Sequence, residues 1–381
     1  MKKLLSLSLA FIIALQAFTP LTSAAEAPKQ YAEIAPAKGE VRAVWVSRFQ
    51  FKTKADIVRI MADIKKNNFN TVFFQVRGEA DAFYKSSYEP WSKMLTGTLG
   101  KDPGYDPLQT AIDEGHKNGL QVHAWVNVFT VWQGKTAPDK TAVPQHLYYA
   151  HPEWFQVNDK GQKMDLNDSY IFADPANLDL QQHLIKVFRE IVTKYNVDGL
   201  HLDYVRYPSA SYGYSEISQK RFKAQKKFKD FSNWRRDELT KFVTKIADIV
   251  HETSAHKKKL SAAVIGYHVD KWNWGLAKSG SYDKYLQDSK RWIKESRVDF
   301  ITPMIYWTIG AKPDFTTLVK DFASVNPNKV VVGMSTTDFS AVETWNQIMV
   351  TRANKMKGFS LFSYGSNNKL WDTFRTQIAK W

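Results

Sequence analysis

Hydrophobic positions along the chain follow two periods, one typical of strands and one typical of helices. Short apolar runs, alternating where polar residues interrupt them, predict buried strands at residues 41–47, 71–77, 121–128, 198–203, 259–265, 298–307, 329–334 and 359–364. Apolar residues spaced by three or four positions predict helices at residues 54–67, 107–118, 180–195, 236–253, 282–295, 314–324, 341–356 and 370–379. Strands and helices therefore alternate along the whole pattern.

This alternation predicts a parallel sheet with right-handed crossovers, and eight repeats fit a single closed (β/α)8, TIM-like barrel of the α/β class. An open doubly wound sheet is the alternative. It is disfavoured because Ser-Arg-Phe-Gln follows the first strand, at residues 47–50, instead of a glycine-rich phosphate-binding turn. The connections after strands two to five are long, which predicts a deep cleft at the C-terminal rim; they span residues 78–106, 129–179, 204–235 and 266–281.

The first residues have the pattern of an export signal. Lys2 and Lys3 precede an apolar run over residues 4–18, and small residues follow around Ala24 and Ala25. We expect a signal peptide at residues 1–25, a linker at 26–40 and the barrel domain at 41–381, with a retained membrane anchor as the alternative. The expected location is secreted or associated with the cell wall. The sequence contains no cysteine, which excludes disulfides and thiol chemistry.

The net charge is +15 at pH 7. In an exported protein, this excess favours electrostatic association with anionic wall polymers over binding to nucleic acid. A soluble basic surface without a specific partner is an equally simple interpretation. The sequence indicates no stable protein partner, no cofactor and no metal.

Polar side chains stand where several predicted strands end. Period two places His201 and Asp203 on one face of strand 198–203, and Arg206 follows. A buried acid costs free energy unless it is paired or used. If the barrel forms, the ends of the predicted strands meet at one rim. Beside His201, Asp203 and Arg206, this rim would carry Gln75, Arg77, His123, Trp125, Asn127, Tyr306, Trp307 and Tyr364.

The long connections are rich in tryptophan and tyrosine, whose flat rings suit the C–H faces of sugars. Rim acids with aromatic loops suggest glycoside hydrolysis, which needs two carboxyl groups across the scissile bond. Asp203 is the first candidate. Its partner is expected among Glu79, Asp81 and Asp270, unless a 2-acetamido group of the substrate acts as the nucleophile. A metal-dependent hydrolase using His123 and His201 is disfavoured because the spacing lacks an HExxH-type motif.

Several ordered blocks give the chain a specific resemblance to a known family. They include Arg42-Ala43-Val44-Trp45-Val46, His123-Ala124-Trp125-Val126-Asn127, Asp198-Gly199-Leu200-His201-Leu202-Asp203-Tyr204 and Thr302-Pro303-Met304-Ile305-Tyr306-Trp307. On these residues the chain resembles the glycosyl-hydrolase-like 10 family from about residue 39 onward. The resemblance implies a TIM-like barrel and, for some members, cleavage of peptidoglycan strands stripped of stem peptides.

The resemblance also carries residue roles onto this chain. It implies that Asp203 is the catalytic carboxylate at the end of strand four, and Glu79 and Asp81 match family acids. Many members have a second acid directly after the first, where this chain has Tyr204, so any mechanism that needs a neighbouring pair is in doubt. We rank Glu79 above Asp270 as the partner of Asp203.

The sequence therefore predicts an exported glycoside hydrolase with Asp203 and Glu79 as catalytic residues. The residues expected to bind substrate are Gln75, Arg77, Asp81, His123, Trp125, Asn127, His201, Arg206, Tyr306, Trp307 and Tyr364. The alternative is a non-catalytic barrel that binds glycan at the cell wall, motivated by Tyr204 and the basic charge. A carboxyl separation of about 5 to 9.5 Å would favour catalysis.

Overall fold

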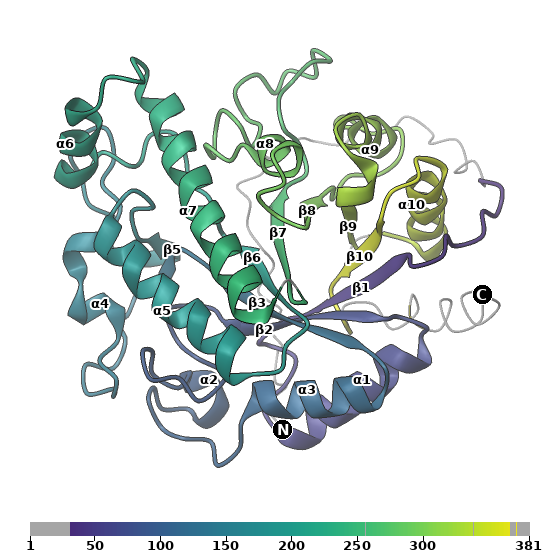
Figure 1. The fold of residues 1–381 in the computed structure, drawn as a ribbon, viewed down its shortest axis with the longest axis horizontal. Helices are drawn as coiled ribbons and strands as arrows, with labels where there is room; N and C mark the ends of the chain where they lie inside the picture. The colour runs from purple at the N-terminus through teal and green to yellow at the C-terminus, as the bar shows by residue number, and fades with distance from the viewer. Residues whose placement is uncertain (1–30, 256, 338, 366–370, 372–381) are drawn as a thin grey trace, which may run out of the picture. The chain divides into compact units, whose positions relative to one another are not determined.

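Eight parallel strands close into a barrel, as predicted (Figure 1). The computed structural model describes residues 31–255, 257–337, 339–365 and 371. Around the barrel the strands follow the order β1-β10-β9-β8-β7-β6-β3-β2, and β1 pairs with both β2 and β10. Their bounds are β1 Val41–Val46, β2 Thr71–Arg77, β3 Gln121–Asn127, β6 Gly199–Asp203, β7 Lys259–Ile265, β8 Phe300–Met304, β9 Val331–Ser335 and β10 Gly358–Phe362.

Helices connect successive barrel strands and cover the outside of the barrel (Figure 1). The side chains that point outward from the strands, such as Val44, Val72 and Leu200, join one large core with the helices. The inward side chains form a second core, which includes Trp45 and Phe73. The crossover helices are α1 Lys54–Lys66, α3 Pro107–Lys117, α5 Leu178–Lys194, α7 Phe231–Ser254, α8 Ser289–Lys294, α9 Phe315–Ala323 and α10 Ala341–Ala353.

The first crossover helix shows how the sequence forms these elements. Thr53 and Asp56 make a capping box at the start of α1, so the first free backbone amides are satisfied. Ile57, Ile60 and Ile64 lie on one buried stripe at helical spacing. In agreement with Figure 1, α1 packs beside α3, and α5 packs beside α7.

One predicted helix is much shorter in the structure. The helix predicted at 282–295 is reduced to α8, which starts at Ser289. The side chain of Asp288 caps it by accepting a hydrogen bond from the backbone amide of Arg291. A helix cannot run continuously through this stretch, because Leu286 has a φ of +51°. The predicted terminal helix at 370–379 and the predicted signal peptide lie outside the described residues, apart from the buried Trp371.

The long loops contain structure that the sequence pattern did not predict. Between β3 and α5, β4 (Thr130–Gly134) and β5 (Asn167–Phe172) form a two-stranded antiparallel sheet. Short helical segments complete the connections: α2 Lys93–Thr96, α4 Leu147–Ala150, η1 Pro152–Trp154, α6 Glu216–Ala224 and η2 Pro327–Lys329. Among the described helices, none is long and apolar enough to cross a membrane.

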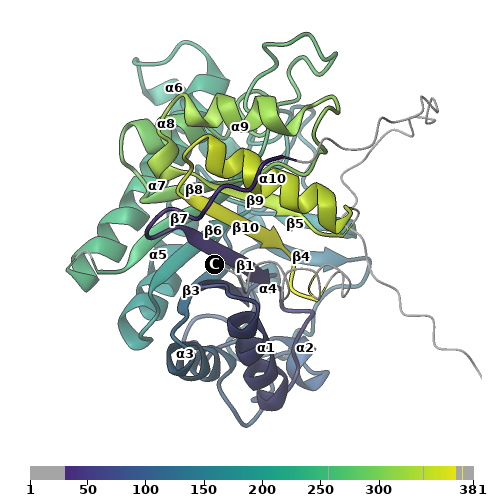
Figure 2. The ribbon, with the colours of Figure 1, turned by 90° about the vertical axis from the view of Figure 1, so that its right-hand side faces the viewer.

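The described part of the predicted linker, residues 31–40, packs along α10 (Figure 2). The Tyr31 amide donates to Asn346 Oδ1 at 3.3 Å, and Arg352 donates to the carbonyl oxygen of Ile34 at 2.7 Å. Arg352 also makes two charge-assisted hydrogen bonds to Glu40, at 2.8 and 2.9 Å, between side chains that are 4% and 3% exposed. This segment therefore belongs to the packed domain.

Candidate active site

The strand register brings three predicted polar residues together at one end of the barrel. On β3 and β6, Trp125 lies opposite His201, and Asn127 lies opposite Asp203. Because the strands are parallel, the Asn127–Asp203 pair marks the C-terminal rim and the Trp125–His201 pair lies deeper. The side-chain amide of Gln75 donates to Asn127 Oδ1 at 3.3 Å, so β2 joins the same cluster.

The carboxylate of Asp203 is buried beside a guanidinium group. Its Oδ1 accepts hydrogen bonds from the backbone amide of Tyr204 at 2.6 Å and from Arg206 Nη1 at 3.2 Å. Burial raises the pKa of Asp203, and the charge of Arg206, the Tyr204 amide and the Trp125 indole offset only part of that increase. An acid held in this way at a barrel rim is typical of a functional group.

His201 lies below Asp203 and is held as a neutral ring. Trp45 Nε1 can only donate, so His201 Nε2, at 3.0 Å, accepts and His201 Nδ1–H donates to Ser261 Oγ at 2.8 Å. The imidazole also stacks on Phe73, with ring centroids 3.9 Å apart and planes 1° apart. Complete burial lowers the pKa of His201 well below its usual value. The structure therefore makes His201 part of the packed floor beneath the site.

His123 lies inside the barrel, close to Phe73 and Phe300 at centroid distances of 5.7 and 6.1 Å. Within the described residues, neither ring nitrogen has a hydrogen-bond partner, and burial lowers the pKa of His123 to about 4. Both ring nitrogens of His201 are already engaged, so these two histidines do not form a metal pair. In the part of the chain that the structure describes, no three His, Cys, Asp or Glu side chains are grouped to hold a metal ion.

Glu79 lies in the turn after β2 and is paired with Arg48, which follows β1. Arg48 Nη2 contacts Glu79 Oε1 at 2.5 Å and also donates to the Tyr170 hydroxyl at 3.1 Å. Burial raises the pKa of Glu79 to about 7; the charge of Arg48 opposes this increase, and nearby Asp81 adds to it. At neutral pH, Glu79 therefore populates both protonation states, as a general acid requires.

A series of contacts links the two candidate carboxylates. Arg48, the partner of Glu79, also donates a hydrogen bond to Tyr170 on β5. The ring centroid of Tyr170 lies 5.2 Å from that of Tyr204. The guanidinium of Arg206 lies 4.3 Å from the centre of the Tyr204 ring, and it also donates a hydrogen bond to the carboxylate of Asp203. Tyr204 has a φ of +50°, a left-handed conformation that costs energy for a tyrosine and is typical of functional sites.

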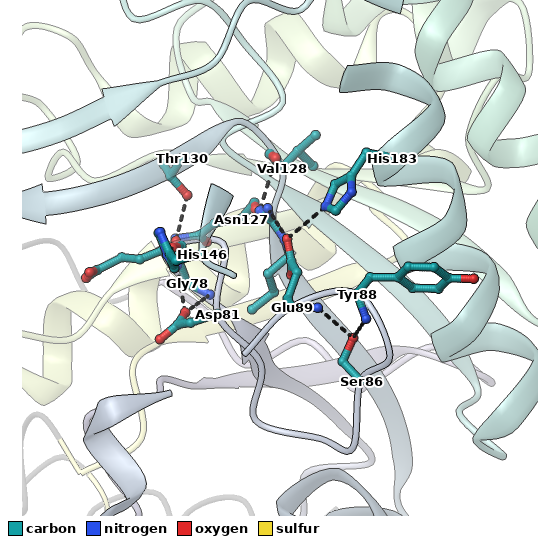
Figure 3. Close-up of polar contacts among 12 residues, drawn as sticks. Gly78, Asp81, Ser86, Tyr88, Glu89, Asn127, Val128, Thr130, His146 and His183 are labelled. Carbon is teal, nitrogen blue, oxygen red and sulfur yellow. Dashed lines mark hydrogen bonds and ion pairs between the residues drawn. The ribbon is translucent and has the colours of Figure 1, made fainter. Parts of the chain in front are cut away.

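Two predicted substrate-binding residues instead hold the loop after β2. Arg77 is 1% exposed and binds Glu89 through Nε and Nη2, at 2.8 and 2.7 Å, and it also bonds carbonyl groups at the end of β3. Asp81 accepts hydrogen bonds from the backbone amides of Gly78 and Glu79, at 3.3 and 2.8 Å. Figure 3 shows how these contacts fix the loop against the end of β3. The structure thus uses both side chains to position Glu79.

The aromatic residues predicted on the last strands lie in different places. The Tyr306 hydroxyl is buried close to Asp203, and burial and then the charge of Asp203 raise its pKa well above the usual value. Trp307 is half-buried, and its carbonyl oxygen accepts a hydrogen bond from Gln347. Tyr364 points toward α1, where its hydroxyl contacts Asp63 Oδ2 at 3.2 Å. The structure therefore does not bring Tyr364 to the carboxylates.

The sequence pattern did not indicate four residues that lie around Glu79. Arg48 and Phe49 follow β1; Phe49 is 65% exposed, and the Arg48 guanidinium lies 4.7 Å from its ring centre. Tyr170 comes from the unpredicted β5. His146 Nε2 lies 2.7 Å from the backbone carbonyl oxygen of Glu79, so it must donate, while its Nδ1 accepts from an amide of α4. The only sequence signal was the polar and aromatic content of residues 47–50, directly after a barrel strand.

Comparisons with known proteins agree on a glycoside hydrolase framework. The profile of the family described as "Glycosyl hydrolase-like 10" matches residues 40–344. The chain is 30% identical over 292 residues to "Glycosyl hydrolase YngK" of Bacillus subtilis, covering 71% of this chain and 55% of that protein. It is 29% identical over 261 residues to "Glycosyl hydrolase DigH" of Escherichia coli K12, covering 64% and 56%. The chain thus spans about half the length of these curated relatives.

A solved structure shares the fold at low sequence identity. The glycoside hydrolase domain of PgaB (BpsB) from Bordetella bronchiseptica superposes with a TM-score of 0.62 at 11% identity. The superposition covers 88% of this chain and 98% of that domain. At this identity the likeness concerns the barrel fold alone.

Proposed function

Because the chain belongs to the glycosyl hydrolase-like 10 family, we propose that it is an exported glycoside hydrolase acting on a cell-wall glycan. The proposed substrate is peptidoglycan glycan from which the stem peptides have been removed. Three features of the chain support this assignment: the leader-like first residues, the net charge of +15, and aromatic loops that suit sugar rings. The observation that carries the proposal is a pair of carboxyl groups, the buried Asp203 and the partly buried Glu79, connected by the series of contacts described above.

The two carboxyl groups have environments suited to different roles. Glu79, with a pKa near 7, would protonate the leaving oxygen of the glycosidic bond. Burial raises the pKa of Asp203, and Arg206 and the amide of Tyr204 oppose that increase by favouring its ionised form. In that form it would stabilise positive charge at the anomeric carbon, either as the nucleophile or by orienting a water molecule or the substrate's own acetamido group.

The rim also offers surfaces that suit a sugar. Phe49 presents an exposed ring beside the Arg48–Glu79 pair, and a pyranose could stack on it next to the proposed acid. Gln75 and Asn127 bring amide groups to the strand ends beside Asp203, where they could bond hydroxyl groups of the bound ring.

The proposal is tested by incubating the protein with intact peptidoglycan and with amidase-treated glycan, and analysing released fragments by mass spectrometry. Wild type should release saccharides from the amidase-treated glycan, and Asp203→Asn should release almost none. Asp113→Asn, the same change at an exposed position on α3, is the matched control and should retain full activity. Equal release by wild type and Asp203→Asn would contradict the role of Asp203.

A non-catalytic glycan-binding barrel is the second candidate. It is favoured by one observation: Arg48 and Arg206 already neutralise both carboxylates in this structure. Binding of the glycan without release of any fragment by the wild-type protein would support this alternative over hydrolysis.

A further inference from the structure

An aromatic hollow lies in the connection between β3 and α5, apart from the contacts that hold Glu79 and Asp203. It encloses about 400 Å³ and is lined by Tyr148, Tyr149, Pro152, Phe155, Lys163, Met164 and Asp165. A volume of this size lies within the range of small-ligand sites, which is about 300–1,000 Å³. None of these side chains takes part in the catalytic geometry described above.

The walls of the hollow form an aromatic corner. The ring of Tyr148 stands nearly perpendicular to that of Tyr149, with centroids 5.0 Å apart and planes at 83°. The centroid of the Phe155 ring lies 5.4 Å from that of Tyr148, with planes at 43°. The corner is held in place because the Tyr149 hydroxyl donates to the Pro138 carbonyl oxygen at 3.0 Å. A flat apolar face next to a perpendicular ring suits the C–H face and the edge of a pyranose.

Side chains of both charges line the hollow. Lys163 is exposed; its ammonium lies 3.3 Å from the Pro152 carbonyl oxygen and 5.4 Å from the centre of the Phe155 ring. Asp165 is exposed as well, and its charge contributes to raising the pKa of Tyr148, after burial. One donor and one acceptor of opposite sign favour a ligand with hydroxyl and amide groups over a purely anionic one.

The hollow shares its loop with the catalytic rim. Asp165 lies two residues before β5, and β5 carries Tyr170, which binds Arg48 beside Glu79. We propose that this hollow is a second saccharide-binding site that holds one or two amino-sugar rings of the polymer at a distance from the bond to be cleaved. This inference rests on the proposed function, because it takes the occupant to be the same glycan.

The test measures binding separately from cleavage. In an Asp203→Asn background, which prevents turnover, isothermal titration calorimetry is carried out with glycan strands released by amidase and with N-acetylated chitotetraose. Tyr148→Ala should weaken binding of the long strands about tenfold, because it removes the stacking face. Tyr148→Phe keeps the ring and should bind as the parent does. Unchanged affinity in Tyr148→Ala would overturn the proposal.

A second variant covers the case in which Tyr148→Ala does not fold. Lys163→Ala combined with Asp165→Ala changes exposed side chains only and should also weaken binding of the long strands. Binding equal to that of the parent would refute the site.

Cleavage assays distinguish this proposal from the proposed function. With catalytically intact protein, Tyr148→Ala should raise KM for long strands and leave cleavage of the tetrasaccharide unchanged. If wild type cleaves neither glycan but Tyr148→Ala still lowers affinity, hydrolysis fails and the binding site stands. If wild type cleaves and Tyr148→Ala binds normally, the binding site alone fails.

Discussion

At the scale of single residues, Glu79 makes the sharpest prediction about pH. If Glu79 donates the proton, kcat/KM should fall as pH rises through about 7, where burial places its pKa. Arg48 lowers this pKa, so Arg48→Met should move the falling limb to higher pH. The measurement is a pH–rate profile of glycan cleavage for both proteins. If kcat/KM fell at the same pH in Arg48→Met as in wild type, a group other than Glu79 would be titrating.

The same carboxyl group affects stability with a definite sign. The pKa of Glu79 is raised from its usual 4.5 to about 7 on folding, so its protonated form favours the folded state. Its contribution is fully present below pH 4.5 and is lost as pH rises through about 7. Chemical denaturation should therefore show wild type losing stability relative to Glu79→Gln over this interval. A difference that is constant with pH would contradict the raised pKa.

The sequence predicted which face of a strand each candidate residue lies on better than it predicted the contacts that the residue makes. Period two placed His201 and Asp203 on one face, and the register confirms that both point into the barrel. How deep each of these side chains lies in the barrel could not be predicted, because that depends on the register between strands that are far apart in the sequence. The ion pair of Arg48 with Glu79 joins residues from different connections, and the local pattern around residue 48 contains no signal for it.

At the scale of elements, the turn after β2 requires glycine at residue 78, because there is no space there for a side chain. A Cβ atom at Gly78 would overlap the guanidinium of Arg48. Gly78→Ala should therefore cost about 1–3 kcal/mol of unfolding free energy and reduce activity by displacing Arg48 from Glu79. Unfolding curves and glycan-release rates would measure both effects.

Gly104→Ala is the matched control for this substitution. Its φ of +77° makes alanine unfavourable, but no atom would lie within 4 Å of the added carbon. It should cost about 1–2 kcal/mol of stability and leave activity unchanged. If Gly78→Ala behaved in the same way as Gly104→Ala, Arg48 would not depend on the space at residue 78.

The elements were predictable where local periodicity was strong. The stripe of isoleucines in α1 and the apolar strands follow from local spacing, and their positions were predicted closely. The β4–β5 sheet was missed because its strands are short, polar at several positions and separated by more than 30 residues. This sheet carries Tyr170, so the missed element is also a missed part of the site.

At the scale of the whole described domain, barrel closure agrees with the predicted fold, and one contact fastens the segment before β1. Arg352 and Glu40 form an ion pair whose side chains are almost fully buried. Arg352→Met would leave the buried Glu40 carboxylate with only a 4.0 Å contact to Arg42, which should cost about 3 kcal/mol of unfolding free energy. Adding Glu40→Gln should recover part of this loss. Equal stability of wild type and Arg352→Met in chemical denaturation would show that the pair contributes little.

The central claim is that Glu79 and Asp203 act together in one glycosidic cleavage, and a double-mutant cycle tests it most directly. The measurement is kcat/KM on amidase-treated glycan for wild type, Glu79→Gln, Asp203→Asn and the double variant. Groups that act in the same step are strongly non-additive. We predict that each single substitution abolishes most of the activity and that the double variant is little worse than either one. The account would be contradicted if the fold-losses in kcat/KM of the two single variants multiplied in the double variant, or if either single variant kept full activity.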